Sequence, residues 1–157
     1  MNVIRSINHS VLFPFLFAIA VASAPAQEAK DCGAIPLTND LLDKMDAFVK
    51  TMTGDAAAKA ELVEIGKDST ANTTSEGWVS AVNSKCPKTA ANLKSAGISV
   101  EDFAKGMFAL LACSMSEDLA KSEDAVIKAN AEFIKANNAR ATKTFADFMQ
   151  LTMPATP

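Results

Sequence analysis

Apolar residues recur at helical spacing along most of this 157-residue chain, and that periodicity limits the folds it can adopt. The clearest case lies between Thr38 and Gly54, where six apolar side chains share one helical face. Thr38 can cap this helix, Asp40 adds a favourable negative charge to its first turn, and Gly54 can end it. The six residues are Leu41, Leu42, Met45, Phe48, Val49 and Met52. No segment shows the alternation of apolar and polar residues that is typical of a strand.

Capping residues, glycine and proline divide the following stretch into three more helices. Asp55 can cap a helix that runs to about Lys67. A shorter helix is predicted over 75–85, after a polar loop. Pro87 suits the first position of the next helix, which Gly97 ends.

The C-terminal part of the domain contains a strongly apolar helix followed by two amphipathic helices. Ser99 begins the apolar helix, and because apolar residues cover most of its circumference we expect it to be central and buried. Its small residues form a stripe that another helix can approach, namely Gly106, Ala109 and Cys113. A further helix begins after Ser122, a break is expected near Asn137 and Asn138, and Pro154 stops the last helix.

These segments predict an all-α fold, a small orthogonal or irregular bundle of five to seven helices. We assign it to a single domain over 38–153, preceded by an irregular segment over 27–37. The length fits one hydrophobic core without a second domain.

The N-terminus has the three parts of a cleavable export signal in the usual order. Arg5 provides positive charge, 11–22 is an apolar run too short to span a bilayer, and an Ala-Pro-Ala sequence follows. We therefore expect a signal peptide over 1–26, cleaved between Ala26 and Gln27. The exported protein would be periplasmic or extracellular, with no stable membrane span.

Composition excludes several kinds of chemistry from the exported protein. The only histidine, His9, lies inside the signal, so imidazole-based triads and His-ligated metal centres are not expected. The charges are interspersed, the net charge of the full chain is −3, and no basic block marks a nucleic-acid surface. No haem, zinc or calcium motif is present, so we expect no cofactor and no metal.

Three cysteines remain after the signal, which leaves three possible pairings for one disulfide. Cys32 lies in the expected irregular segment and Cys86 at a helix junction, where each can reach a partner. Cys113 lies inside the apolar helix, where a cysteine usually behaves as a small hydrophobic residue. We predict a Cys32–Cys86 disulfide, while pairing through Cys113 stays open.

Two sets of residues are candidates for a functional site. The first is a set of carboxylate pairs, and two such groups can hydrolyse glycosides. Most of them fall at expected helix starts, where negative charge is favourable, so caps or solvated faces are the simpler interpretation. The pairs are Glu61 with Glu64, Glu101 with Asp102, Glu117 with Asp118, and Glu123 with Asp124.

The second set consists of methionine and phenylalanine residues on the apolar faces, chiefly Met45, Phe48, Met107 and Phe108. Such residues usually form core, but they can also line an adaptable face for an apolar ligand or a partner helix. We therefore expect a non-enzymatic binding module for an unknown protein partner or apolar ligand. The alternative is a hydrolase or lyase that works through carboxylates such as Glu61 and Glu64.

We predict that the exported protein begins at Gln27, because the bond before it follows the small-residue sequence of the signal. Intact mass measurement of the protein recovered outside the cytoplasm tests this. A recovered chain that still carries Met1 would contradict the signal assignment.

Overall fold

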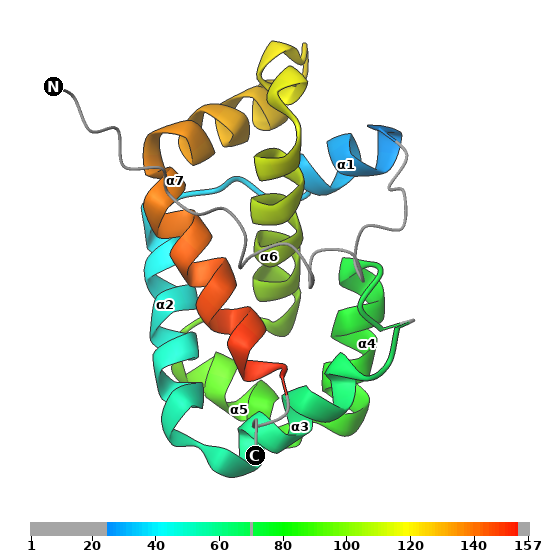
Figure 1. The fold of residues 1–157 in the computed structure, drawn as a ribbon, viewed down its shortest axis with the longest axis vertical. Helices are drawn as coiled ribbons and strands as arrows, with labels where there is room; N and C mark the ends of the chain where they lie inside the picture. The colour runs from blue at the N-terminus through cyan, green and yellow to red at the C-terminus, as the bar shows by residue number, and fades with distance from the viewer. Residues whose placement is uncertain (1–24, 70, 154–157) are drawn as a thin grey trace, which may run out of the picture.

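The computed structural model describes residues 25–69 and 71–153, and these form a bundle of seven α-helices and one 3-10 helix (Figure 1). No strand occurs in the described ranges, so the predicted all-α fold is confirmed. The signal residues through position 24, including His9, lie outside these ranges. The elements are α1 (Pro25–Cys32), α2 (Asn39–Gly54), α3 (Ala56–Gly66), α4 (Ser75–Lys85), α5 (Pro87–Ser95), α6 (Val100–Met115), η2 (Glu117–Lys121) and α7 (Ala125–Leu151).

Side-chain caps begin several helices at the residues that the sequence predicted. Thr38 Oγ1 accepts a hydrogen bond from Leu41 N at 3.1 Å at the start of α2. Asp55 accepts bonds from Ala57 N and Ala58 N at the start of α3, and Ser99 accepts from Asp102 N at 2.9 Å in α6. Each bond satisfies a backbone donor that has no partner within the helix.

Gly97 ends α5 through a left-handed turn. Its φ is +73°, a conformation that residues with a Cβ rarely adopt. In this turn Gly97 N donates to Lys94 O, and Ile98 N donates to Leu93 O, both at 3.1 Å. The two bonds satisfy carbonyls of the last helical turn and direct the chain into α6.

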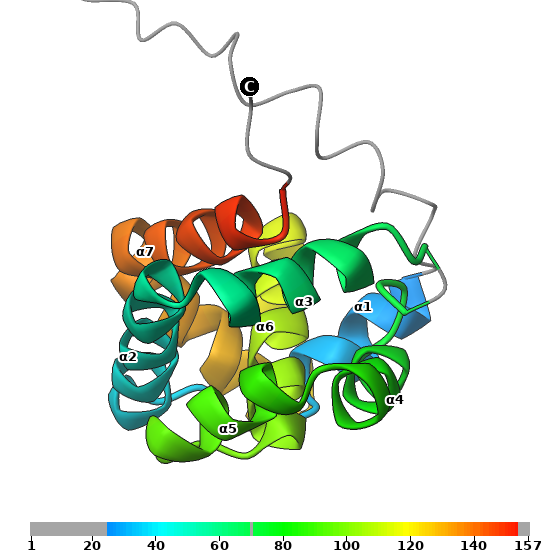
Figure 2. The same cartoon turned by 90° about the horizontal axis from the view of Figure 1, so that it is seen from below.

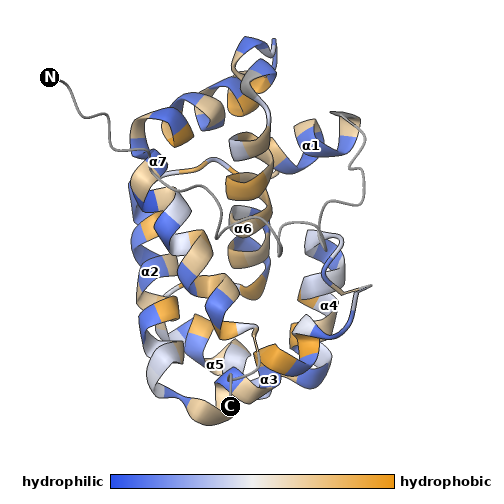
Figure 3. Ribbon diagram, viewed as in Figure 1, coloured by the Kyte–Doolittle hydropathy of each residue, from blue (hydrophilic) through white to orange (hydrophobic). Residues whose placement is uncertain are grey.

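Helix α6 occupies the centre of the bundle, with α1, α4, α5 and α7 packed around it (Figures 1 and 2). Its buried aromatic residue Phe103 contacts three rings from three other helices. The ring centroids lie 4.7 Å from Phe48 of α2, 5.2 Å from Phe148 of α7 and 5.5 Å from Trp78 of α4. Coloured by hydropathy, α6 is largely apolar, while most surrounding helices carry polar residues on their outer faces (Figure 3).

Helix α7 bends at Asn137, where the sequence predicted a break. Asn137 has non-helical backbone angles, φ −116° and ψ 20°, and its side-chain amide donates to Phe133 O at 2.9 Å. The first half of α7 packs near α1 and η2, and the second half packs against α2 and α3. The break is therefore a bend within one helix that lets it cover two parts of the bundle.

The expected irregular segment over 27–37 is wrong in its first part, because α1 is helical through Cys32. A side-chain bond from Gln27 to Asp31 at 2.9 Å spans one turn of this helix. Because an isolated helix of 8 residues is only marginally stable in water, α1 depends on its packing against α6. Local sequence therefore gives little indication of α1. The expected cleavage bond, Ala26 to Gln27, lies within this helix.

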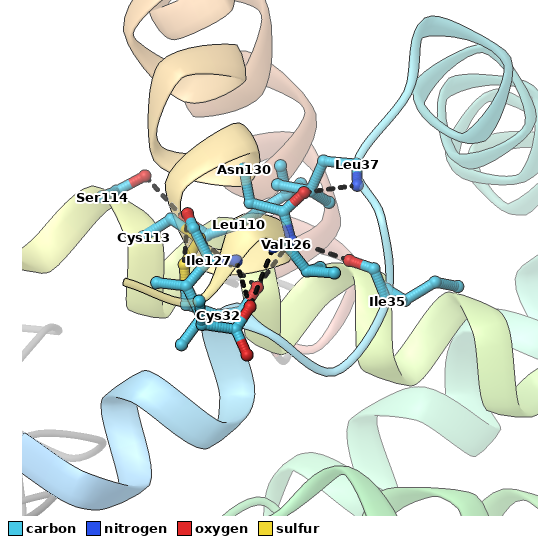
Figure 4. Close-up of a disulfide and its surroundings, with 10 residues drawn as sticks. Cys32, Ile35, Leu37, Leu110, Cys113, Ser114, Val126, Ile127 and Asn130 are labelled. Carbon is cyan, nitrogen blue, oxygen red and sulfur yellow. Dashed lines mark hydrogen bonds between the residues drawn. A yellow bond between two sulfur atoms is a disulfide. The ribbon is translucent and has the colours of Figure 1, made fainter. Parts of the chain in front are cut away.

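The disulfide joins Cys32 to Cys113, and the predicted Cys32–Cys86 pairing is wrong (Figure 4). The Cα atoms of the bonded pair are 5.2 Å apart. Cys86, which directly follows α4 in the chain, is a buried free thiol. Cys113 reaches a partner because α1 packs against α6 beside it and not because it lies in a loop, whereas Gly106 of the same stripe faces Met45 of α2. The bond holds the end of α1 against the central helix.

A buried asparagine fixes the backbone that follows α1. Asn130 of α7 donates to Cys32 O at 2.6 Å and to Ile35 O at 2.8 Å, and it accepts from Leu37 N at 2.7 Å (Figure 4). Its side chain is 1% exposed, so these bonds replace water for three main-chain groups. The segment between α1 and α2 is thereby tied to α7.

We predict that the Cys86→Ala variant, unfolded without reductant, exposes no reactive thiol, and that the wild-type chain exposes one. Thiol titration under denaturing conditions measures this directly. In the same series, Cys32→Ala with Cys113→Ala lowers the free energy of unfolding by about 4 to 5 kcal/mol, because it removes the constraint on a long loop. A Cys86→Ala chain that exposes two thiols would instead indicate pairing through Cys86.

Candidate functional site

The apolar residues predicted as a ligand or partner face lie in or against the core. Met45 and Phe48 are 0% exposed and Met107 is 5% exposed, while Phe108 is half-buried and packs on the core cluster. The structure brings these residues into one core but leaves no open face over Met45, Phe48 and Met107. A binding surface must therefore be sought elsewhere.

Glu61 and Glu64 line a groove between α3 and α4, which we call the α3–α4 groove. Its volume is about 440 Å³. It is lined by Ala57, Ala60, Glu61, Glu64, Ile65, Asp68, Ala81, Lys85 and Cys86. The groove thus brings together one carboxylate pair that the sequence analysis selected and one cysteine that it paired wrongly.

The Glu61 carboxylate caps the start of α5. It accepts bonds from Lys88 N at 3.2 Å, Thr89 N at 2.9 Å and Thr89 Oγ1 at 3.0 Å. A helix start favours a negative charge, and Cys86, the N-cap residue of α5, makes no side-chain cap bond. Glu61 therefore has a structural task that accounts for its carboxylate, whereas Glu64 forms an exposed pair with Lys67 at 2.5 Å.

Cys86 at the base of this groove is a weak nucleophile. Burial, and then the negative charge of Glu61, raise the pKa of its thiol to about 11. Its Sγ lies 3.7 Å from Glu61 O, and the side chain is 1% exposed. The thiolate needed for covalent chemistry is thus scarce near neutral pH.

One residue of each remaining predicted carboxylate pair has a structural partner. Asp124 caps α7 by accepting from Val126 N and Ile127 N, as expected for a helix start. Glu101 pairs with Lys105 at 2.6 Å, and hydrogen bonding to Lys121 lowers the pKa of Asp118. Glu101, Asp118 and Asp124 lie at helix ends or in the 3-10 helix, and none of the three lines this groove or the larger one between α2 and α7.

A second and larger groove runs between α2 and the second half of α7, and we call it the α2–α7 groove. Its volume is about 730 Å³, within the range of small-ligand sites. The first turn of α3 contributes Lys59 to this groove. The lining residues are Asp46, Val49, Lys50, Thr53, Gly54, Lys59, Arg140, Lys143, Thr144, Asp147, Gln150 and Leu151.

Arg140 and Asp46 join the two walls of this groove. Arg140 donates from Nε and Nη2 to Asp46 Oδ2 at 3.0 and 2.7 Å, and from Nη2 to Asp43 Oδ1 at 2.5 Å. Bonding to Asp46 and then to Asp43 raises the pKa of Arg140. Thr144, 2% exposed, donates to Asp46 Oδ1 at 2.5 Å. These bonds hold α7 in register with α2 just beyond its bend.

Two lysines of the α2–α7 groove have no ion pair with a described residue. Lys143 pairs with Asp147 across one helical turn, but neither Lys50 nor Lys59 forms an ion pair with any residue that the structure describes. The groove as a whole has four basic side chains against two acidic ones. It is therefore a positively charged recess in a chain whose net charge is −3.

No residue of this groove was predicted from the sequence to belong to a functional site, although Val49 and Gly54 were assigned to the helix that forms one wall. Arg140 carries the one usable signal, because apart from Arg5 it is the only arginine in the chain. A planar guanidinium suits two-point binding of carboxylates better than lysine does, so a lone arginine indicates a specific pairing. Its partners, however, lie 94 and 97 residues earlier in the chain.

The described part of the chain contains no candidate for a metal site or a membrane span. Over residues 25–69 and 71–153, no cluster of three or more histidine, cysteine or acidic side chains is placed to bind a metal. In the same part of the chain, no helix combines the length and the apolar character required to cross a bilayer. Comparison with protein-family models, with curated proteins and with solved structures found no match.

We predict that Glu61→Gln lowers the free energy of unfolding by about 1 to 2 kcal/mol, because the start of α5 loses a charged acceptor. Glu64→Gln is the matched control in the same groove. Its exposed pair with Lys67 is worth about 0.5 kcal/mol or less. Urea unfolding of both variants tests the assignment, and equal effects would show that Glu61 has no special role.

Proposed function

We propose that this protein is an exported, non-enzymatic binding module, and that the α2–α7 groove is its binding surface. The main support for the proposal is that Lys50 and Lys59, which have no ion pair with a described residue, line a groove of about 730 Å³. A ligand can pair with such charged side chains without first breaking an ion pair within the protein. The proposal thus moves the binding surface from the apolar face that the sequence favoured to a polar one.

Rigidity of the groove walls supports a binding role. The Arg140 and Thr144 bonds to Asp46 fix α7 against α2, and the floor residues Val49 and Leu151 are 7% and 4% exposed. Where α3 meets the end of α7, a Cβ on Gly66 would come within 2.8 Å of Thr152 O. A preformed site loses less conformational entropy when it binds.

Export is supported by the N-terminal sequence and is compatible with the disulfide. The residues 1–26 have the arrangement of a cleavable signal. Disulfides persist in oxidising compartments and are rare in the cytosol, so the Cys32–Cys113 bond fits a periplasmic or extracellular protein.

The enzymatic alternative is the weaker hypothesis. It relies on Glu61 and Glu64, yet the Glu61 carboxylate is occupied by three donors at the start of α5. The neighbouring thiol of Cys86 is held in its neutral form by a pKa of about 11. No observation on these residues favours a hydrolase or a lyase over a cap.

A photo-crosslinking pair tests the binding role. Benzoylphenylalanine in place of Thr53, on the groove wall, is expected to form one discrete adduct in the compartment where the protein accumulates. The same group in place of Ser95, an exposed residue of α5 outside the groove, is expected not to form it. Gel analysis and mass spectrometry read out the adduct, and thermal unfolding controls for folding. Indistinguishable labelling from both positions would contradict the proposal.

A further inference from the structure

The charge and shape of the α2–α7 groove restrict what can occupy it. We infer that it binds a short extended segment of an acidic polypeptide, an inference that rests on the proposed binding function. The segment would place acidic side chains on Lys50 and Lys59 and apolar side chains on the groove floor.

Charge complementarity gives the sign of the ligand. Arg140 and Lys143 pair with Asp43, Asp46 and Asp147, so Lys50 and Lys59 are the groove cations without an ion pair among the described residues, and the four cations outnumber the three carboxylates by one. Lys50 lies on α2 and Lys59 on α3, so the two charges come from different walls. A ligand with two separated negative groups can pair with both lysines.

The length of the groove fits a few extended residues. Its lining on α2 runs from Asp46 to Gly54, which corresponds to about 12 Å at 1.5 Å per helical residue. Extended chain rises about 3.3 Å per residue, so about four or five residues fit. Alternate side chains of an extended segment point in opposite directions, which allows one set to meet the lysines and the other to meet Val49 and Leu151.

The lining favours a polypeptide over other polyanions. Asp147, Thr53 and Gln150 lie among the cations and offer acceptors that main-chain amides can use. The Asp147 carboxylate repels any anion, and a phosphate chain has no main-chain N–H donors that could offset this repulsion. The apolar floor lies between two helices, so a flat anionic membrane cannot reach it while it contacts the rim.

The test uses the full exported chain and two synthetic pentapeptides, blocked at both ends, with the sequences Glu-Leu-Glu-Leu-Glu and Lys-Leu-Lys-Leu-Lys. NMR titration is expected to show binding of the acidic peptide, with shifts at Thr53, Gly54 and Gln150, and none of the basic one. The variant with both Lys50→Glu and Lys59→Glu is expected to bind the acidic peptide about tenfold more weakly. Its reversed charges are expected to favour the basic peptide.

The variant with both Lys128→Glu and Lys135→Glu is the matched control, because these lysines are exposed on the first half of α7 and do not line the groove. It has the same change in net charge and is expected to bind the acidic peptide like the wild type. Circular dichroism during thermal unfolding establishes that both double variants are folded. Equal weakening in the two variants would overturn the inference, because it would show only an effect of net charge.

Three further outcomes would also overturn it. One is the absence of acidic-peptide binding at low salt. Another is binding of phosphatidylglycerol vesicles or tripolyphosphate that depends on Lys50 and Lys59 while the peptide does not bind. The third is self-association, detected by sedimentation, that the groove variant abolishes. A discrete adduct at Thr53 together with any of these would leave the binding function standing and remove only the acidic polypeptide as its ligand.

Discussion

The structure depends on the need to remove α6 from water. Eight of its residues are buried, from Phe103 to Cys113, and they lie on most sides of the helix. A helix of this kind has to be surrounded, and α1, α4, α5 and α7 provide that enclosure. The ring of Phe103 then joins α2 to the same core through Phe48. Burial of one apolar helix thus determines the arrangement of the remaining helices, and the charged groove forms outside that core.

Helices fixed by local chemistry were predictable, and features fixed by distant contacts were not. The cap residues Thr38, Asp55 and Ser99 act within three residues of themselves, and Gly97 ends α5 through its own backbone conformation. In contrast, α1 is held by packing on α6 and by a disulfide to a residue 81 positions later. The predicted cysteine pairing is wrong for the same reason, because contact between α1 and α6, and not position in a loop, brings Cys32 and Cys113 together.

The candidate site was less predictable than the fold. The groups that the sequence selected, Glu61 and Met45 among them, have structural roles as a cap and as core. Lys50 and Lys59 resemble any other exposed lysines in the sequence, and only the meeting of α2, α3 and α7 places them in one recess. A pattern within one helix shows which face is buried. It does not show which exposed residues of two helices will face each other.

The ties between α1 and α7 also affect the order of folding. Asn130 binds main-chain groups 93 to 98 residues earlier, so these contacts close very long loops. Loop-closure entropy delays such contacts relative to the shorter-range packing among α2 to α6. We therefore expect the N-terminal segment to be fixed late. The bond at which we expect signal cleavage lies within α1, so late docking of α1 would leave this bond accessible while the rest of the bundle assembles.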